Sequence, residues 1–116
     1  MNQSATDKRI YVRIPVHVHT TVKDEDFDGT MTFVSEDLSI GGVFLRSDYV
    51  FDIGTGLDIE LNLPDECGIV RATAKVVWAR IEDGAGSPGM GISFVDFSDV
   101  DRRLLEQFVA AQAGSA

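Results

Sequence analysis

Short runs of alternating apolar and polar residues recur along this sequence and constrain its fold more than any other feature. Leu or Ile occupies every second position from 57 to 63, and Val or Ile does so from 10 to 18. Because the side chains of a β-strand point alternately to opposite faces, each run predicts a strand with one buried face. Pro15 lacks a backbone N–H, which predicts that the first of these strands lies at an edge or a bulge.

Turn-forming residues divide the rest of the chain into further short strands. Acidic residues before Gly29, the Pro64-Asp65-Glu66 segment and a glycine-rich segment supply the turn signals. Beyond the two runs above, we expect strands at residues 30–34, 43–46, 68–82 and 90–97, with turns at 23–29, 35–42, 64–66 and 83–89. Six short strands joined by turns favour a mainly β fold, a small closed or partly open antiparallel barrel.

The last part of the chain changes to a helical period. Ser98 and Asp101 are spaced as a capping box, with Asp in place of the usual Glu or Gln. The apolar residues that follow at helical spacing are Val100, Leu104, Leu105, Phe108 and Val109. This pattern predicts a C-terminal helix that fades between residues 111 and 115. A helix of about 14 residues is marginal alone, so its apolar stripe should dock on the barrel.

Length and charge limit the possible classes of function. The 116 residues fit one domain, and ten Lys and Arg against nineteen Asp and Glu give a formal net charge of -9. A phosphate backbone requires a broadly basic face, so we expect no DNA binding, and a local basic cluster must hold any anionic ligand. The single cysteine, Cys67, cannot form an intrachain disulfide, and no apolar run approaches the roughly 20 residues of a membrane helix. A cytoplasmic location without membrane insertion is therefore expected.

Three pattern matches do not support a cofactor, metal or catalytic site. Residues 84–89 fit G-x-G-x-x-G but lead into a predicted strand, whereas a dinucleotide fingerprint must open a helix. Residues 24–29 resemble the opening of a calcium loop, yet Ser35 stands where that loop needs a bidentate Glu. His17 and His19 share a strand face but have no third ligand spaced to complete a zinc site. We therefore expect no cofactor, no metal and no enzyme.

Two short elements carry more specific chemistry. The first contains Lys8, Arg9 and Arg13, so that three of the ten basic residues fall within six positions. In an extended segment Arg9 and Arg13 point to one side, and a guanidinium pair suits a phosphate or the O6/N7 edge of guanine. The second is Asp37 with Ser39 in a predicted turn, where the carboxylate can accept the N1–H and N2–H of a guanine. Taken alone, the first also fits a solvated positive edge and the second an ordinary turn.

Together these elements resemble the PilZ domain family. The resemblance rests on Arg9-x-x-x-Arg13 followed by Asp37-x-Ser39-x-x-Gly42, and it extends to Val76-Val77-Trp78 and to residues 89–94. Residues 39–45, which contain a doubled glycine, are similar to a subgroup of stand-alone, single-domain members. The resemblance implies a six-stranded antiparallel β-barrel with a C-terminal α-helix, and binding of the bacterial second messenger cyclic di-GMP.

The resemblance also implies roles for individual residues. Arg9 and Arg13 would clamp the phosphates and the guanine Hoogsteen edges of the ligand. Asp37 and Ser39 would contact a guanine from the barrel surface, and Gly42 would leave room for the ligand to approach.

Two further residues are implied with alternatives left open. Lys8 would add positive charge near the phosphates, and either one or two ligand molecules could bind. Trp78 would either stack on a base or pack on the barrel. Along the chain we expect a flexible leader over residues 1–8, the barrel domain with its helix over 9–112, and a disordered tail over 113–116.

The expected function is that of a cyclic di-GMP receptor or adaptor. Ligand binding would order the N-terminal Arg segment on the barrel and present a new surface to a downstream protein partner. The alternative is a PilZ-fold protein–protein interaction module that acts without nucleotide. A small enzyme acting on nucleotides is a third interpretation, but no general base or metal ligand can be named for it.

Overall fold

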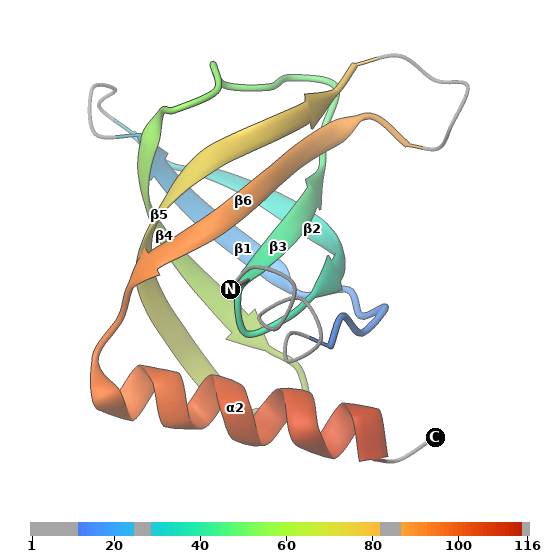
Figure 1. The fold of residues 1–116 in the computed structure, drawn as a ribbon, viewed down its shortest axis with the longest axis vertical. Coiled ribbons are helices and arrows are strands. Elements are labelled where there is room, and N and C mark those ends of the chain that lie inside the picture. The colour runs from blue at the N-terminus through green and yellow to red at the C-terminus, as the bar shows by residue number, and fades with distance from the viewer. Residues whose placement is uncertain (1–11, 25–28, 82–86, 115–116) are drawn as a thin grey trace, which may run out of the picture.

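Six antiparallel strands form a closed barrel, and a helix lies across one end of it (Figure 1). The computed structural model describes residues 12–24, 29–81 and 87–114. The elements in chain order are β1 (His19–Asp24), β2 (Met31–Leu38), β3 (Gly42–Arg46), β4 (Gly56–Leu63), β5 (Gly68–Arg80), β6 (Gly89–Asp96) and α2 (Asp99–Gly114). Around the barrel the strands follow the order β1-β2-β3-β6-β5-β4. The expected six-stranded antiparallel barrel with a C-terminal helix is confirmed.

The barrel interior is filled by every second residue of the strands, as the alternation predicts. In β4 the buried side chains are Leu57, Ile59, Leu61 and Leu63. In β5 they are Val70, Ala72, Ala74 and Val76. Full burial of one Leu, Ile or Val side chain contributes roughly 1.5–3 kcal/mol. The inward faces therefore stabilise the barrel, and the outward faces are available for binding.

The segment before β1 differs from the expected strand. Within residues 12–18, the described part of the strand expected over 10–18, Ile14 alone forms a β-bridge, with Leu38 of β2. The two residues exchange backbone N–H···O bonds of 2.8 and 2.9 Å. The expected strand is therefore wrong over the described residues, and the first strand of the barrel is β1, which follows this segment directly.

A serine side chain and a proline explain why no regular ladder forms there. The Ser35 hydroxyl accepts a bond from the backbone N–H of Val18 (2.7 Å) and donates one to the carbonyl oxygen of Val16 (2.6 Å). These bonds use backbone groups that a ladder would pair, and Pro15 has no N–H to donate. The alternation still sets burial, because Ile14 and Val18 belong to the core.

The second strand is longer than the sequence predicts. β2 extends well beyond the expected strand at 30–34, with a bulge between Ser35 and Asp37. The turn expected over residues 35–42 is correspondingly shorter, because its first half is strand. Asp37 therefore lies within a strand and Ser39 directly after it, rather than both within a turn.

The helix α2 begins at the predicted cap. Ser98 Oγ accepts a bond from the backbone N–H of Asp101 (3.1 Å) and donates one to the Asp101 carboxylate (2.7 Å). The buried side chains of α2 are Leu105, Phe108 and Val109. Val100 was expected in this stripe but is 71% exposed, because it lies five positions before Leu105, a rotation of about 140° around the helix. No helix in the described part of the chain is long and apolar enough to cross a membrane.

Candidate functional site

A hydrogen-bonded ion pair joins the segment before β1 to the end of β2. Arg13 donates from Nε (3.0 Å) and Nη2 (2.5 Å) to Oδ1 of Asp37, 24 positions later in the chain. The backbone bridge between Ile14 and Leu38 holds the two segments side by side at this point. The Arg13 and Asp37 side chains are 48% and 34% exposed, so the pair lies where a ligand in solution can reach it.

Ser39 shapes the turn between β2 and β3. Its hydroxyl oxygen accepts bonds from the backbone N–H groups of Gly41 (3.1 Å) and Gly42 (3.2 Å), and its own N–H donates to the Gly42 carbonyl (2.8 Å). The residue is only 1% exposed. Arg13 Nη1 lies 3.5 Å from the hydroxyl oxygen, so Ser39 connects the turn to the ion pair.

Gly42 allows β3 and β6 to approach closely. A Cβ atom at this position would lie 2.2 Å from the carbonyl oxygen of Ile92, which is a backbone atom and cannot rotate away. Gly42 pairs with Ser93 at the start of the β3–β6 ladder. Glycine is therefore required here by the packing of the barrel itself.

A surface pocket of about 370 Å³ lies beside these groups. Its lining includes Arg13, Ser39 and Gly42 from the predicted motifs, and Trp78 from β5. The remaining lining residues are Gly41, Val43, Val77, Gly91, Ile92 and Ser93. Asp37 does not line the pocket, but it is hydrogen-bonded to Arg13, which lines it. The described residues of the predicted site thus lie together, although they come from distant parts of the chain.

Trp78 both packs on the barrel and lines the pocket. Its indole stacks on the ring of Phe44, with 5.2 Å between ring centroids and 21° between ring planes. The residue nevertheless stays 45% exposed. A Cβ atom at Gly91 would lie 2.1 Å from Trp78 Nε1, so the indole lies directly against the backbone of β6.

Phe44 and Gly91 were not predicted as site residues, although the sequence contains a signal for Gly91. Gly89 and Gly91 are two apart in the sequence, and since both belong to the strand β6 they lie on one face of it. Glycine inside a strand often marks a close approach by another group. Here that group is an aromatic pair, which a single sequence does not reveal because its two rings come from different strands.

Other predicted residues lie outside the description. Lys8 and Arg9 are not among the described residues, nor are residues 25–28 of the calcium-like loop or residues 82–86. Gly89, the last residue of the G-x-G-x-x-G match, begins the strand β6 rather than a helix. In the part of the chain that the structure describes, no group of three or more His, Cys, Asp or Glu is placed to hold a metal ion.

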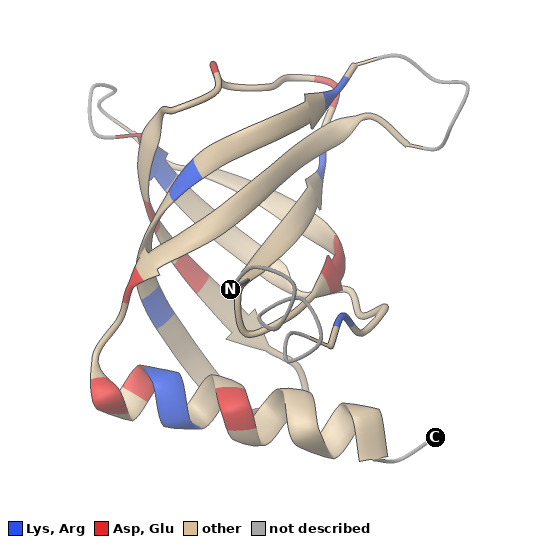
Figure 2. Ribbon diagram, in the orientation of Figure 1, with Lys and Arg blue, Asp and Glu red and all other residues tan. Residues whose placement is uncertain are grey.

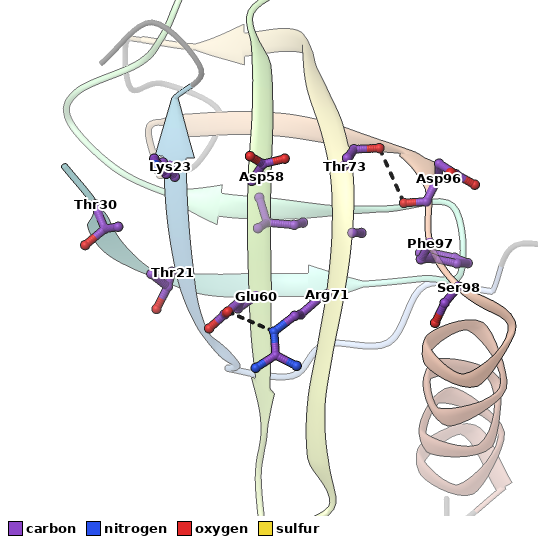
Figure 3. A pocket seen from close by; sticks show the side chains of 12 residues that line it. Thr21, Lys23, Thr30, Asp58, Glu60, Arg71, Thr73, Asp96, Phe97 and Ser98 are labelled. Atoms are coloured by element: carbon purple, nitrogen blue, oxygen red, sulfur yellow. Dashed lines mark hydrogen bonds and ion pairs between the residues drawn. The ribbon is translucent and has the colours of Figure 1, made fainter. Parts of the chain in front are cut away.

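A larger pocket, of about 660 Å³, lies on the outer surface of β1, β4 and β5 (Figure 3). Its lining carries two basic residues, Lys23 and Arg71, against the three acidic residues Asp58, Glu60 and Asp96. Arg71 is already paired with Glu60 through Nε and Oε2 at 3.0 Å. Charges of both signs are spread over the barrel and α2 (Figure 2). This acidic pocket suits an anionic ligand less well than the one beside Arg13.

Comparison with known proteins identifies the family of this chain and agrees with its fold. The sequence matches the PilZ domain over residues 7–111, and the chain belongs to this family. The predicted membership of the PilZ family is therefore confirmed. No curated protein matches the chain.

Solved structures of low sequence identity share the fold. The inhibitor of motility MotI/DgrA from Bacillus subtilis matches with a TM-score of 0.72 and 19% identity, over 90% of this chain and 51% of that one. YcgR from Escherichia coli in complex with c-di-GMP matches with a TM-score of 0.73 and 20% identity, over 90% of this chain and 46% of that one. The PilZ domain of YcgR with c-di-GMP, also from Escherichia coli, matches with a TM-score of 0.69 and 21% identity, over 90% of this chain and 91% of that one. The chain thus spans about half the length of the first two proteins.

Proposed function

We propose that this protein is a receptor for cyclic di-GMP that binds the ligand in the pocket lined by Arg13 and Trp78. Membership of the PilZ family supports the proposal, as do two solved structures of the same fold that contain c-di-GMP. The observation that carries it is the Arg13–Asp37 pair, a cation and a hydrogen-bond acceptor held together beside a pocket of about 370 Å³.

The chemistry of this pair suits a guanine dinucleotide. A guanidinium group can donate two parallel bonds to a phosphate or to the O6/N7 edge of guanine. The carboxylate of Asp37 can accept the N1–H and N2–H of a guanine. Both bonds from Arg13 end on Oδ1, so this pair leaves the second carboxylate oxygen, Oδ2, for a ligand.

The proposal includes an ordering step in the N-terminal segment. Cyclic di-GMP would draw Lys8 and Arg9 onto the barrel beside Arg13, and the ordered segment would form a surface for a downstream protein. This step rests on the sequence, where the three basic residues fall within six positions. No group is assigned a catalytic role, so bound cyclic di-GMP should be recovered unchanged by chromatography.

Calorimetric titration with cyclic di-GMP tests the site. Each bidentate Arg contact is worth roughly 1–3 kcal/mol, so replacing Arg9 and Arg13 together with Ala should weaken binding by about one and a half to four decades. The matched control replaces Arg71 and Arg103 with Ala, which removes the same charge from exposed positions outside the pocket. Undiminished affinity in the Arg9/Arg13 variant would refute the assigned site.

Hydrogen exchange tests the ordering step separately. Amide exchange of residues 1–13 should slow on saturation with cyclic di-GMP, and unchanged exchange would refute the ordering step while leaving the site intact. A flat titration of the unmodified protein at millimolar ligand would instead support the nucleotide-independent interaction module.

A further inference from the structure

An aromatic side chain is buried on the outside of the barrel, next to the pocket. Phe44 is 2% exposed, yet its neighbours Val43 and Leu45 are the residues of β3 that belong to the core cluster. Because successive strand residues face opposite sides, the Phe44 ring lies on the outer wall. Outward positions are usually solvated, so a buried ring there requires something to cover it.

Two glycines of β6 allow that cover to form. Gly91 pairs with Phe44 of β3 on one side and with Trp78 of β5 on the other (Figure 1 shows the three strands side by side). A Cβ atom at Gly89 would lie 2.6 Å from Phe44 Cζ, and one at Gly91 would lie 2.1 Å from Trp78 Nε1. The outer face of β6 is therefore bare here, and the two rings meet across it.

A third side chain completes the arrangement. The Arg80 guanidinium lies over the Phe44 ring, 4.7 Å from its centroid, and 5.8 Å from the centroid of Trp78. Its Nε donates to the Ser87 carbonyl (2.7 Å), and its Nη2 lies 3.5 Å from a carboxylate oxygen of Glu36. Contacts from two separate segments thus hold the cation against the aromatic pair.

We propose that Arg80, held by Glu36 and stacked on Phe44, is a positioning residue that fixes the Trp78 indole as a rigid wall of the ligand pocket. This inference rests on the proposed function, because the ligand is the one named there. Arg80 does not line the pocket, whereas Trp78 does, so Arg80 acts on the ligand through the indole. Fixing a half-exposed ring before binding removes the entropy that the ligand would otherwise lose in ordering it.

The variant Arg80→Met tests this role because it keeps an unbranched apolar side chain and removes the guanidinium. The free energy of a cation–π contact at a partly exposed site corresponds to about a two- to fivefold change in a dissociation constant. The dissociation constant for cyclic di-GMP should therefore rise by that factor. Trp78 is the single tryptophan, so near-ultraviolet circular dichroism and fluorescence anisotropy of the ligand-free protein report on its order. Both signals should fall in Arg80→Met and return towards the unmodified values in Arg80→Lys, which keeps the cation.

Arg71→Met is the matched control. Arg71 lies on the same strand and pairs with Glu60 much as Arg80 pairs with Glu36, but no cation–π contact involves it among those found in the described residues. It should change neither the tryptophan signals nor the affinity. Phe44→Leu gives a second variant that removes the stacked ring while keeping apolar volume, and it should reduce the same signals and the same affinity.

The outcomes separate this inference from the proposed function. Unchanged tryptophan signals in both Arg80→Met and Phe44→Leu would overturn the positioning role, whatever the affinity. Altered signals with unchanged affinity would show that indole order does not matter for binding, and would also overturn it. If the unmodified protein does not bind cyclic di-GMP in calorimetry, the proposed function fails, and this inference about its ligand fails with it. If it binds and the variants bind equally well, only the positioning role fails.

Discussion

At Gly42 a role in ligand approach and a role in barrel packing predict different results. A Cβ atom there would meet the backbone oxygen of Ile92 at 2.2 Å, so β3 and β6 would have to separate. We expect Gly42→Ala to lower the free energy of unfolding by about 1–3 kcal/mol in the absence of ligand. Urea denaturation followed by circular dichroism measures this change.

The control for Gly42→Ala is another glycine with free space around it. A Cβ atom at Gly114 would meet nothing within 4 Å, so Gly114→Ala should change the free energy of unfolding by less than about 1 kcal/mol. If Gly42→Ala is as mild as this control while cyclic di-GMP binding is lost, the glycine serves the ligand and not the barrel.

The sequence predicted that Asp37 and Ser39 lie near each other but not which groups they contact. Asp37 and Ser39 were expected to point together from one turn. In the structure the bulge after Ser35 and the longer β2 place Asp37 in a strand, while the Ser39 hydroxyl closes the turn onto Gly41 and Gly42. The motif spacing shows that these residues belong together. It does not show their shared contact with Arg13, which belongs to a segment distant in the sequence.

The docking of α2 depends on how its first turn is capped. Ser98 satisfies the Asp101 N–H, and the Asp101 carboxylate also accepts the backbone N–H of Arg71 in β5 at 3.1 Å. Loss of an N-cap hydroxyl typically costs about 0.5–2 kcal/mol, so Ser98→Ala should lower the free energy of unfolding within this range. Gln107→Ala, at an exposed position of the same helix, is the control and should be close to neutral. An equal effect of the two substitutions in urea denaturation would contradict the capping role.

Most elements could be predicted from the sequence, and the exception has a physical cause. The alternation and the turn signals together placed β3, β4, β5 and β6 within two residues of their ends. The first strand was misplaced because an inward-facing position of β1 is occupied by a polar residue. Thr20 is fully buried, and its hydroxyl donates to the carbonyl oxygen of Val18 at 3.1 Å. In the sequence a threonine counts as polar, so a buried threonine with a hydrogen-bonded hydroxyl interrupts the apolar alternation that predicts a strand. The expected count of six strands was therefore right although one of them was in the wrong place.

The closed barrel brings together parts of the chain that no local pattern connects. The strand order puts β3, β6 and β5 side by side, so that the β2–β3 turn and the last part of β5 line one pocket. The segment before β1 reaches the same place through its bridge to Leu38. The site is thus a property of barrel closure, and this explains why each motif on its own also fitted an ordinary turn or edge.

At the scale of the whole molecule, net charge should control how fast the ligand arrives. The formal net charge of -9 repels a dianion such as cyclic di-GMP, and the charge of Arg13 is offset by Asp37 in the ligand-free pocket. Raising the salt from about 0.01 M to about 0.15 M shortens the Debye length from about 30 Å to about 8 Å. The association rate constant should therefore increase with salt. Stopped-flow measurement of Trp78 fluorescence on mixing with cyclic di-GMP gives this rate directly.

The two rate constants should respond to salt for different reasons. Dissociation reflects the close contacts of the bound ligand, which salt weakens, so it should also become faster. Replacing Asp65 with Asn and Glu66 with Gln removes two negative charges from an exposed turn away from the pocket. Since this variant has less long-range repulsion to screen, its association rate should be higher at low salt and should depend less on salt. Association that slows as salt rises would instead mean that the local field of the basic residues outweighs the charge of the rest of the protein.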